Sequence, residues 1–249
     1  MCGNMRGNMI GLLHYIMRQE KIELGSFVHV INRGNKQMPI YRQKSDVWRI
    51  LFGLFYTNTS GSSKNWMKEL EREGIDPKTF IWPKKFGERH PLVSILAFTI
   101  MSNHFHLVLK EITENGISKF MHKFTMGYSK FINAKYMESG RLFQNRFQSR
   151  TIEDDEYLRR VAVYVMVKNT FELYPKGGLQ NATRNFEDAW AWALKFPFSS
   201  FSHYAGKRNS PILETDLLGE VFSSSEEFKN FSKDYILGRT ITEDVEDFE

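Results

Sequence analysis

Apolar residues in the first part of the chain follow two different periods. Residues 27–32 are β-branched and aromatic and run into Arg33-Gly34-Asn35, which predicts a strand that ends in a turn. In residues 44–56 apolar side chains recur at three- and four-residue spacing, which predicts a helix. Residues 57–65 are polar and contain glycine, so we expect an exposed loop there, followed by a short helix.

Two apolar runs then lie close together, at residues 93–101 and 105–109, with Ser102-Asn103-His104 between them. Short apolar runs separated by so few polar residues predict a hairpin of two interior strands. Because side chains alternate along a strand, His104 and His106 must face the same side of the second one. Residues 117–137 carry an aromatic stripe at helical spacing beside lysines, which predicts a long amphipathic helix.

A third pair of elements follows. Residues 142–152 alternate like a strand, and the acidic turn 153–156 opens a helix that we expect to reach about residue 173. The resulting order fits an α/β ferredoxin-like (RRM-like) sandwich, with an antiparallel sheet, helices on one face and a helical C-terminal extension. We expect residues 1–25 to form an N-terminal arm, residues 26–175 the core and residues 176–249 the extension.

Composition excludes several classes of protein. The chain has 249 residues, of which 41% are hydrophobic and 25% charged, so it is neither collagen-like nor wholly disordered. Its one cysteine, Cys2, forbids an intramolecular disulfide and a cysteine-based zinc cluster, which suits a reducing cytoplasm. No apolar run is long enough to predict a membrane span, so we expect no membrane partner.

The charge is divided unevenly along the chain. Residues 1–150 hold 23 Lys and Arg against 11 Asp and Glu, whereas residues 151–249 hold 11 against 18. The first part is therefore the expected contact for a polyanion, although a solvated lysine surface would show the same excess. In residues 119–150 basic groups are interleaved with aromatic rings, a mixture that can track phosphates and stack unpaired bases. The candidate DNA contacts are Arg33, Arg141, Arg146, Arg150, Lys123 and Lys130.

Two sets of residues can carry chemistry. His104 and His106 can offer two imidazole nitrogens to one cation, although two such histidines can also simply hydrogen-bond in a polar patch. At 100° per residue, Tyr157, Tyr164 and Lys168 lie together on the flank of their helix. Tyr164 is thus placed at an edge, where its ring can pack while its hydroxyl is exposed; the alternative is an ordinary core tyrosine.

Four segments in order resemble the successive blocks of a known family. They are HVINRGN (29–35), LAFTIMSNHFHLVL (96–109), GRLFQNRFQSRTIEDDEYL (140–158) and FPFSSF (196–201). They look like those of the REP-associated tyrosine transposases, members of the insertion-sequence-200-like single-tyrosine HUH group. The resemblance implies that His104 and His106 bind a divalent metal, Mg²⁺ or Mn²⁺, and that Tyr164 is the nucleophile. It also implies single-stranded or hairpin DNA as the partner, a cytoplasmic, nucleoid-associated protein, and a monomer or homodimer.

The reaction implied by the resemblance is that of a metal-dependent transposase and endonuclease. Tyr164 would attack a phosphate beside a hairpin-forming repeat, giving a 5′-phosphotyrosine link and a free 3′-hydroxyl that can later be rejoined. The competing hypothesis is a catalytically silent DNA-binding module, such as a repressor or hairpin binder. An RNA-binding domain of the same fold would leave the histidine pair and Tyr164 as coincidences.

One departure from the family pattern separates these hypotheses. The family usually has Asn-Pro four and five positions after the tyrosine, with the amide as a further metal ligand, whereas this chain has Lys168 and Asn169. Asn169 could take over through a local shift, Lys168 could act catalytically by supplying part of the metal's charge and lowering the phenol pKa, or the chemistry could be lost. On α-helical angles Asn169 lies about 140° from Tyr164, which favours the last two.

Overall fold

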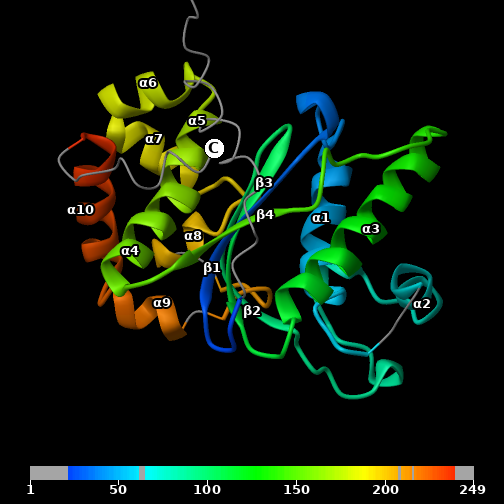
Figure 1. Ribbon diagram of the computed structural model, residues 1–249. Helices are drawn as coiled ribbons and strands as arrows, with labels where there is room; N and C mark the ends of the chain where they lie inside the picture. Colours follow the sequence, from blue (N-terminus) through cyan, green and yellow to red (C-terminus); the bar gives the residue numbers. More distant parts are fainter. Residues whose placement is uncertain (1–21, 62–64, 207–208, 215, 239–249) are drawn as a thin grey trace, which may run out of the picture.

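The computed structural model describes residues 22–61, 65–206, 209–214 and 216–238 (Figure 1). The strands are β1 (Phe27–Arg33), β2 (Val93–Ile100), β3 (His104–Glu111) and β4 (Gln148–Ile152). The helices are α1 (Lys44–Tyr56), α2 (Trp66–Arg72), α3 (Gly116–Tyr136), α4 (Asp155–Val163), the π-helix η5 (Tyr164–Lys168), α5 (Asn169–Glu172), α6 (Gly178–Arg184), α7 (Phe186–Ala193), α8 (Phe201–Tyr204), α9 (Asp216–Val221) and α10 (Ser225–Ile236). Short 3-10 turns are η2 (Asn35–Gln37), η3 (Pro77–Thr79) and η4 (Lys84–Phe86). Cys2 and most of the expected arm 1–25 lie outside the described residues.

The four strands form one antiparallel sheet in the order β2-β3-β1-β4. Helix α1 connects β1 to β2 across β3, and α3 connects β3 to β4 across β1, which is the ferredoxin-like arrangement. The predicted fold class is thus confirmed, as is the hairpin of β2 and β3, but only β3 is an interior strand, since β2 lies at the edge of the sheet. The proposed limits of the core and the extension remain a prediction.

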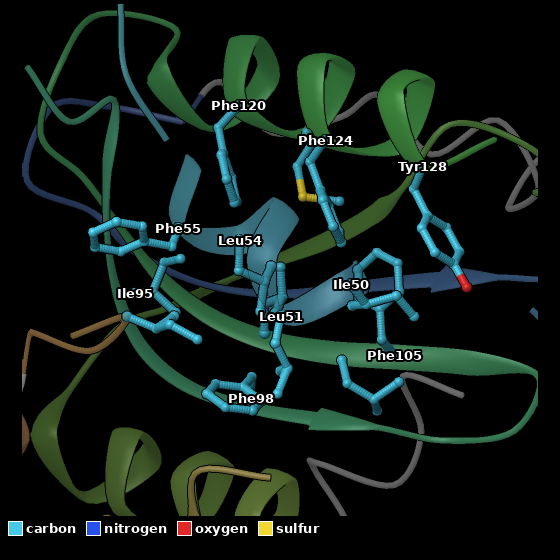
Figure 2. Packing of buried hydrophobic residues seen from close by; sticks show 14 of the residues in the cluster. Ile50, Leu51, Leu54, Phe55, Ile95, Phe98, Phe105, Phe120, Phe124 and Tyr128 are labelled. Atoms are coloured by element: carbon cyan, nitrogen blue, oxygen red, sulfur yellow. The ribbon is translucent and has the colours of Figure 1, made fainter. Parts of the chain in front are cut away.

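One face of the sheet packs against α1 and α3 through a continuous apolar core (Figure 2). Phe105 of β3 meets Phe124 of α3 with ring centroids 5.4 Å apart, and Phe120 stacks on Phe124 from the preceding turn. Gly53 of α1 faces the same ring, and a Cβ atom there would lie only 3.0 Å from it. A glycine therefore allows α1 and α3 to approach closely over the sheet.

The second face of the sheet is covered by the C-terminal helices (Figure 1). Leu96 and Ala97 of β2 and Val108 of β3 pack there against α4 and η5, within a second apolar cluster. The prediction of helices on one face only, with the C-terminal helices as an extension, is therefore wrong. The structure adds this second layer because β2 and β3 are apolar on both sides and need cover on both.

Two predicted elements have different limits in the structure. The strand predicted over 142–152 begins only at Gln148, which pairs with Ile31 of β1. The preceding loop is held instead by an isolated bridge between Gly34 and Phe143 and by the N–H of Gln144, which donates to the Arg33 carbonyl at 2.9 Å. The helix predicted from the acidic turn does reach Glu172, but η5 interrupts it.

Asp46 ties the start of α1 to the end of α3. Its buried carboxylate accepts the backbone N–H groups of Arg42 and Gln43, the ammonium of Lys135 at 2.6 Å and the hydroxyl of Tyr136 at 2.7 Å. Burial alone would raise the pKa of Asp46, but these hydrogen bonds outweigh burial and lower the pKa. The charged form of Asp46 thus stabilises the layer of helices in front of the sheet.

Candidate active site

Three histidines from two neighbouring strands gather on the second face of the sheet. The rings of His104 and His106 have centroids 4.9 Å apart, so the two side chains share a face as their spacing predicts. Nδ1 of His104 lies 2.7 Å from Oδ1 of Asn103; because that oxygen only accepts, His104 donates. His29 of β1 adds a third ring, with Nε2 at 3.0 Å from Nδ1 of His106.

His29 lies in the segment 29–35 that resembles a family block, and it is a site residue that the sequence did not predict. Its signal in the sequence was a lone histidine within the strand predicted over 27–32. The pairing of β1 with β3, which brings His29 beside His106, is a tertiary fact that the local pattern does not contain.

Tyr164 completes the cluster from the helical layer. Its ring centroid lies 5.7 Å from that of His106 and 6.0 Å from that of His29, in edge-on geometry. The structure therefore brings together the predicted histidine pair and the predicted tyrosine. The predicted exposure of its hydroxyl is wrong, however, since Tyr164 is fully buried within the apolar cluster between the sheet and the C-terminal helices.

The helix that carries Tyr164 widens into a π-helix at that residue. The N–H of Asn169 donates to the carbonyl of Tyr164, five residues earlier, where an α-helix would use a residue four earlier. Inside this turn the carbonyl of Val165 accepts the hydroxyl of Thr99 from β2 at 2.6 Å. Because the turn holds one extra residue, Asn169 stands one full turn after Tyr164. The 140° separation expected from α-helical angles is therefore wrong, because this turn is not α-helical.

Asn169 is fully buried, and its amide has an unusual environment. Neither Oδ1 nor Nδ2 has a hydrogen-bond partner within the part of the chain that the structure describes. Such a group normally carries a desolvation cost of about 1–3 kcal/mol, so it is expected where a ligand supplies the missing contact. Across those same residues no three His, Cys, Asp or Glu side chains are grouped to hold a metal ion. The amide of Asn169 is therefore available to a ligand.

Lys168 lies on the same side of the helix as Tyr164, as its spacing predicts. Its ammonium is 4.7 Å from the centre of the Tyr164 ring. The ammonium also forms an ion pair of 2.8 Å with Glu172, one turn later, and the Lys168 side chain is only 14% exposed. Glu172, which the sequence analysis did not single out, therefore compensates part of the charge beside the tyrosine.

Two of the predicted DNA contacts lie on the face that carries the histidines. Arg33 is directly opposite His104 in the pairing of β1 with β3, and Arg150 is directly opposite His29 in the pairing of β1 with β4. Residues directly opposite each other in a sheet project to the same face. The guanidinium of Arg150 lies 5.4 Å from the centre of the Tyr157 ring.

Three more of these residues line a groove of about 690 Å³ between α3 and the loop that precedes β4. Lys130 comes from α3, and Arg141 and Arg146 come from the loop, with Phe147 and Asn32 also in the lining. The bridge between Gly34 and Phe143 holds this loop against the end of β1, next to Arg33. The basic groove thus opens close to the strand end that carries Arg33 and His104.

Lys123 has a different place from the other five basic residues. Its ammonium donates to the carbonyls of Thr59 at 2.5 Å and Gly61 at 2.7 Å, and burial lowers the pKa of this group. Because these contacts tie α3 to the loop after α1, we assign Lys123 a structural role and leave it out of the proposed DNA surface.

Residues 87–168 match the family model described as transposase IS200 like. Among solved structures the chain is similar to a REP-associated tyrosine transposase bound to a REP hairpin, at 14% identity and a TM-score of 0.42, over 78% of this chain and 87% of that one. No curated protein matches the chain. Within the described residues no helix is long and apolar enough to cross a membrane. The segment that matches this family model is the one that carries His104, His106, Tyr164 and Lys168.

Proposed function

We propose that the protein is a single-stranded DNA transposase and nickase that cleaves and rejoins DNA through a 5′-phosphotyrosine link on Tyr164. The observation that carries this proposal is the packing of the Tyr164 ring against His106, with His104 alongside, in the segment that matches the transposase family. All three residues belong to one chain, which supports attack within a single subunit, in a monomer or in each half of a homodimer. Hairpin-forming repeats as the substrate follow from the family resemblance.

The metal implied by the resemblance is Mg²⁺ or Mn²⁺. The amide oxygen of Asn169, which is buried and unpaired, is a ligand type that suits both ions, whereas the imidazoles of His104 and His106 suit a transition metal such as Mn²⁺ better than Mg²⁺. A bound ion would polarise a phosphate oxygen and stabilise the charge that develops there. The metal is inferred from the family resemblance, and the unpaired amide of Asn169 is the observation from this chain that supports it.

In the proposed reaction the phenol oxygen of Tyr164 attacks phosphorus. A bond forms between the phenol oxygen and phosphorus, and the bond from phosphorus to the 3′ oxygen breaks. The phenol loses its proton, and the released 3′ oxygen takes up a proton to become a hydroxyl. The ammonium of Lys168, held over the ring, favours the negative charge that grows on the phenol oxygen. Glu172 fixes the position of this ammonium through their ion pair.

The DNA strand is proposed to follow the basic groove to the histidines. Lys130, Arg141 and Arg146 would neutralise phosphates along the groove, and Arg33 would continue that line to the edge of the site beside His104. Arg150, on the far side of His29, extends the positive surface on the same face. Because Tyr164 is fully buried, side chains around it must move before a phosphate can reach its hydroxyl.

Covalent adduct formation tests this proposal. The native protein is incubated with labelled single-stranded hairpin oligonucleotides and Mn²⁺ or Mg²⁺, and adducts are separated on a denaturing gel. We expect an adduct that disappears in Tyr164→Phe and in His104→Ala. Tyr157→Phe is the matched control, because it changes a neighbouring buried tyrosine on α4 and should leave the adduct intact. An adduct that survives in Tyr164→Phe would rule out this nucleophile.

The second candidate function is a DNA-binding module without cleavage activity. Two observations favour it: the Tyr164 hydroxyl is buried, and the adjacent Lys168 is already paired with Glu172. The same experiment separates the two functions. Hairpin binding without any adduct, for the native protein in both metals, would support the binding module and contradict the nickase.

A further inference from the structure

The hydrogen bond between His29 and His106 raises a question of proton placement. Nε2 of His29 and Nδ1 of His106 are 3.0 Å apart, both side chains are buried, and the rings are nearly parallel at 23°. For two neutral imidazoles, one of these nitrogens must carry the hydrogen while the other accepts it. The choice decides what the opposite nitrogen of His106 can do.

If His29 donates, Nδ1 of neutral His106 is the acceptor and its hydrogen sits on Nε2, which then has no lone pair for a metal. If His106 donates from Nδ1, its Nε2 carries the lone pair. Metal-binding histidines generally donate their other ring N–H to a neighbouring acceptor in this way. His104 already shows that arrangement, since its Nδ1 donates to Oδ1 of Asn103.

We infer that His29 is a positioning residue, whose Nε2 accepts the Nδ1–H of His106 and thereby holds His106 in the tautomer that presents Nε2 to a metal. The inference rests on the proposed metal site and adds to it a residue from a different strand. The backbone holds the two rings in place, because His29 pairs with Val108 and His106 is its diagonal neighbour across the sheet. His104 and His106 then both carry their ring hydrogen on Nδ1, where His104 donates to Asn103 and His106 donates to His29.

The test combines proton placement with metal binding. Long-range ¹H–¹⁵N spectra of the metal-free protein report which nitrogen of His106 is protonated, and electron paramagnetic resonance of Mn²⁺ reports metal affinity. His29→Leu removes the acceptor, whereas His29→Gln restores an oxygen near the position of Nε2. We expect native His106 to be protonated at Nδ1, and His29→Leu to shift His106 towards the Nε2–H tautomer. Mn²⁺ binding in that variant should weaken about 10–100-fold, with recovery in His29→Gln.

Each outcome has a distinct meaning. A native His106 protonated at Nε2 overturns the inference without any variant, and so does a His29→Leu protein that keeps both the Nδ1–H tautomer and the native Mn²⁺ affinity. Thermal unfolding checks that the variants are folded. If His29→Leu does not fold, the inference is judged by the His106 tautomer of the native protein and by the Mn²⁺ affinity of His29→Gln. His104→Ala is the control that should lose Mn²⁺ while leaving the His106 tautomer unchanged. A native protein that binds no Mn²⁺ refutes the proposed metal site itself, and is thereby distinguished from a failure of His29 alone.

Discussion

Replacing Asn169 by leucine should stabilise the metal-free protein while it removes metal-dependent activity. Leucine has nearly the shape of asparagine, with two methyl groups in place of Oδ1 and Nδ2. In the described structure both of these atoms are buried and have no hydrogen-bond partner, so asparagine is desolvated there without compensation. A buried polar group left unpaired costs about 1–3 kcal/mol. Asn169→Leu should therefore raise the free energy of unfolding by about 2 kcal/mol.

Asn58 provides a control in which the same substitution has the opposite sign. Asn58 is also buried, but its Oδ1 accepts the N–H groups of Leu92 and Val93, and its Nδ2 donates to the Val93 carbonyl at 2.8 Å. Asn58→Leu leaves these backbone groups unpaired at the start of β2. It should lower the free energy of unfolding by about 2–4 kcal/mol, since several buried groups lose their partners at once.

The assay is urea unfolding of the metal-free native protein and the two variants, followed by thermal unfolding. For a chain of this size a gain of 2 kcal/mol corresponds to a rise in Tm of about 4–8 °C. Mn²⁺ should raise the Tm of the native protein and not that of Asn169→Leu, because ligand binding to the folded state is what stabilises it. An Asn169→Leu protein that is less stable than the native one by 1 kcal/mol or more would refute the reasoning. It would show that the amide is satisfied in the folded protein rather than reserved for a ligand.

Two further predictions concern charged residues of the first layer and of the groove. Asp46→Asn should destabilise the protein by about 2 kcal/mol at pH 7, because hydrogen bonds to a buried charge are lost. The pKa of Asp46 in the folded protein lies below its ordinary value of 3.8. The stabilisation by its charged form is therefore complete above pH 3.8 and is lost as the pH falls through the folded-state pKa. In urea unfolding from pH 7 to pH 3, the stabilities of the native protein and Asp46→Asn should converge, and a constant difference would contradict this. Arg146→Ala should weaken binding to single-stranded DNA and reduce the slope of log affinity against log salt concentration by about one. Lys123→Met should lower the stability of the protein and leave its DNA affinity unchanged. Equal losses of DNA affinity in the two variants would contradict the placement of the groove.

The local pattern of the sequence was sufficient for most of the elements. Helix α1 has the limits that its apolar spacing predicts, and α3 and the hairpin of β2 and β3 agree within one or a few residues. It was also sufficient to place His104 and His106 on one face, because alternation along a strand is a property of the backbone itself. These features depend on neighbouring residues, and neighbouring residues are what a sequence displays directly.

Tertiary structure alone decided the surroundings of the site. The π-helix at Tyr164 holds an extra residue and accepts a hydrogen bond from Thr99 of a distant strand, and it changes which side chain stands one turn after the tyrosine. The partnership of His29 with His106 depends on β1 lying next to β3, and the burial of Tyr164 depends on the C-terminal helices covering the second face. Each of these results from packing between segments far apart in the chain, and hydrophobic periodicity specifies that a face is buried without specifying what buries it.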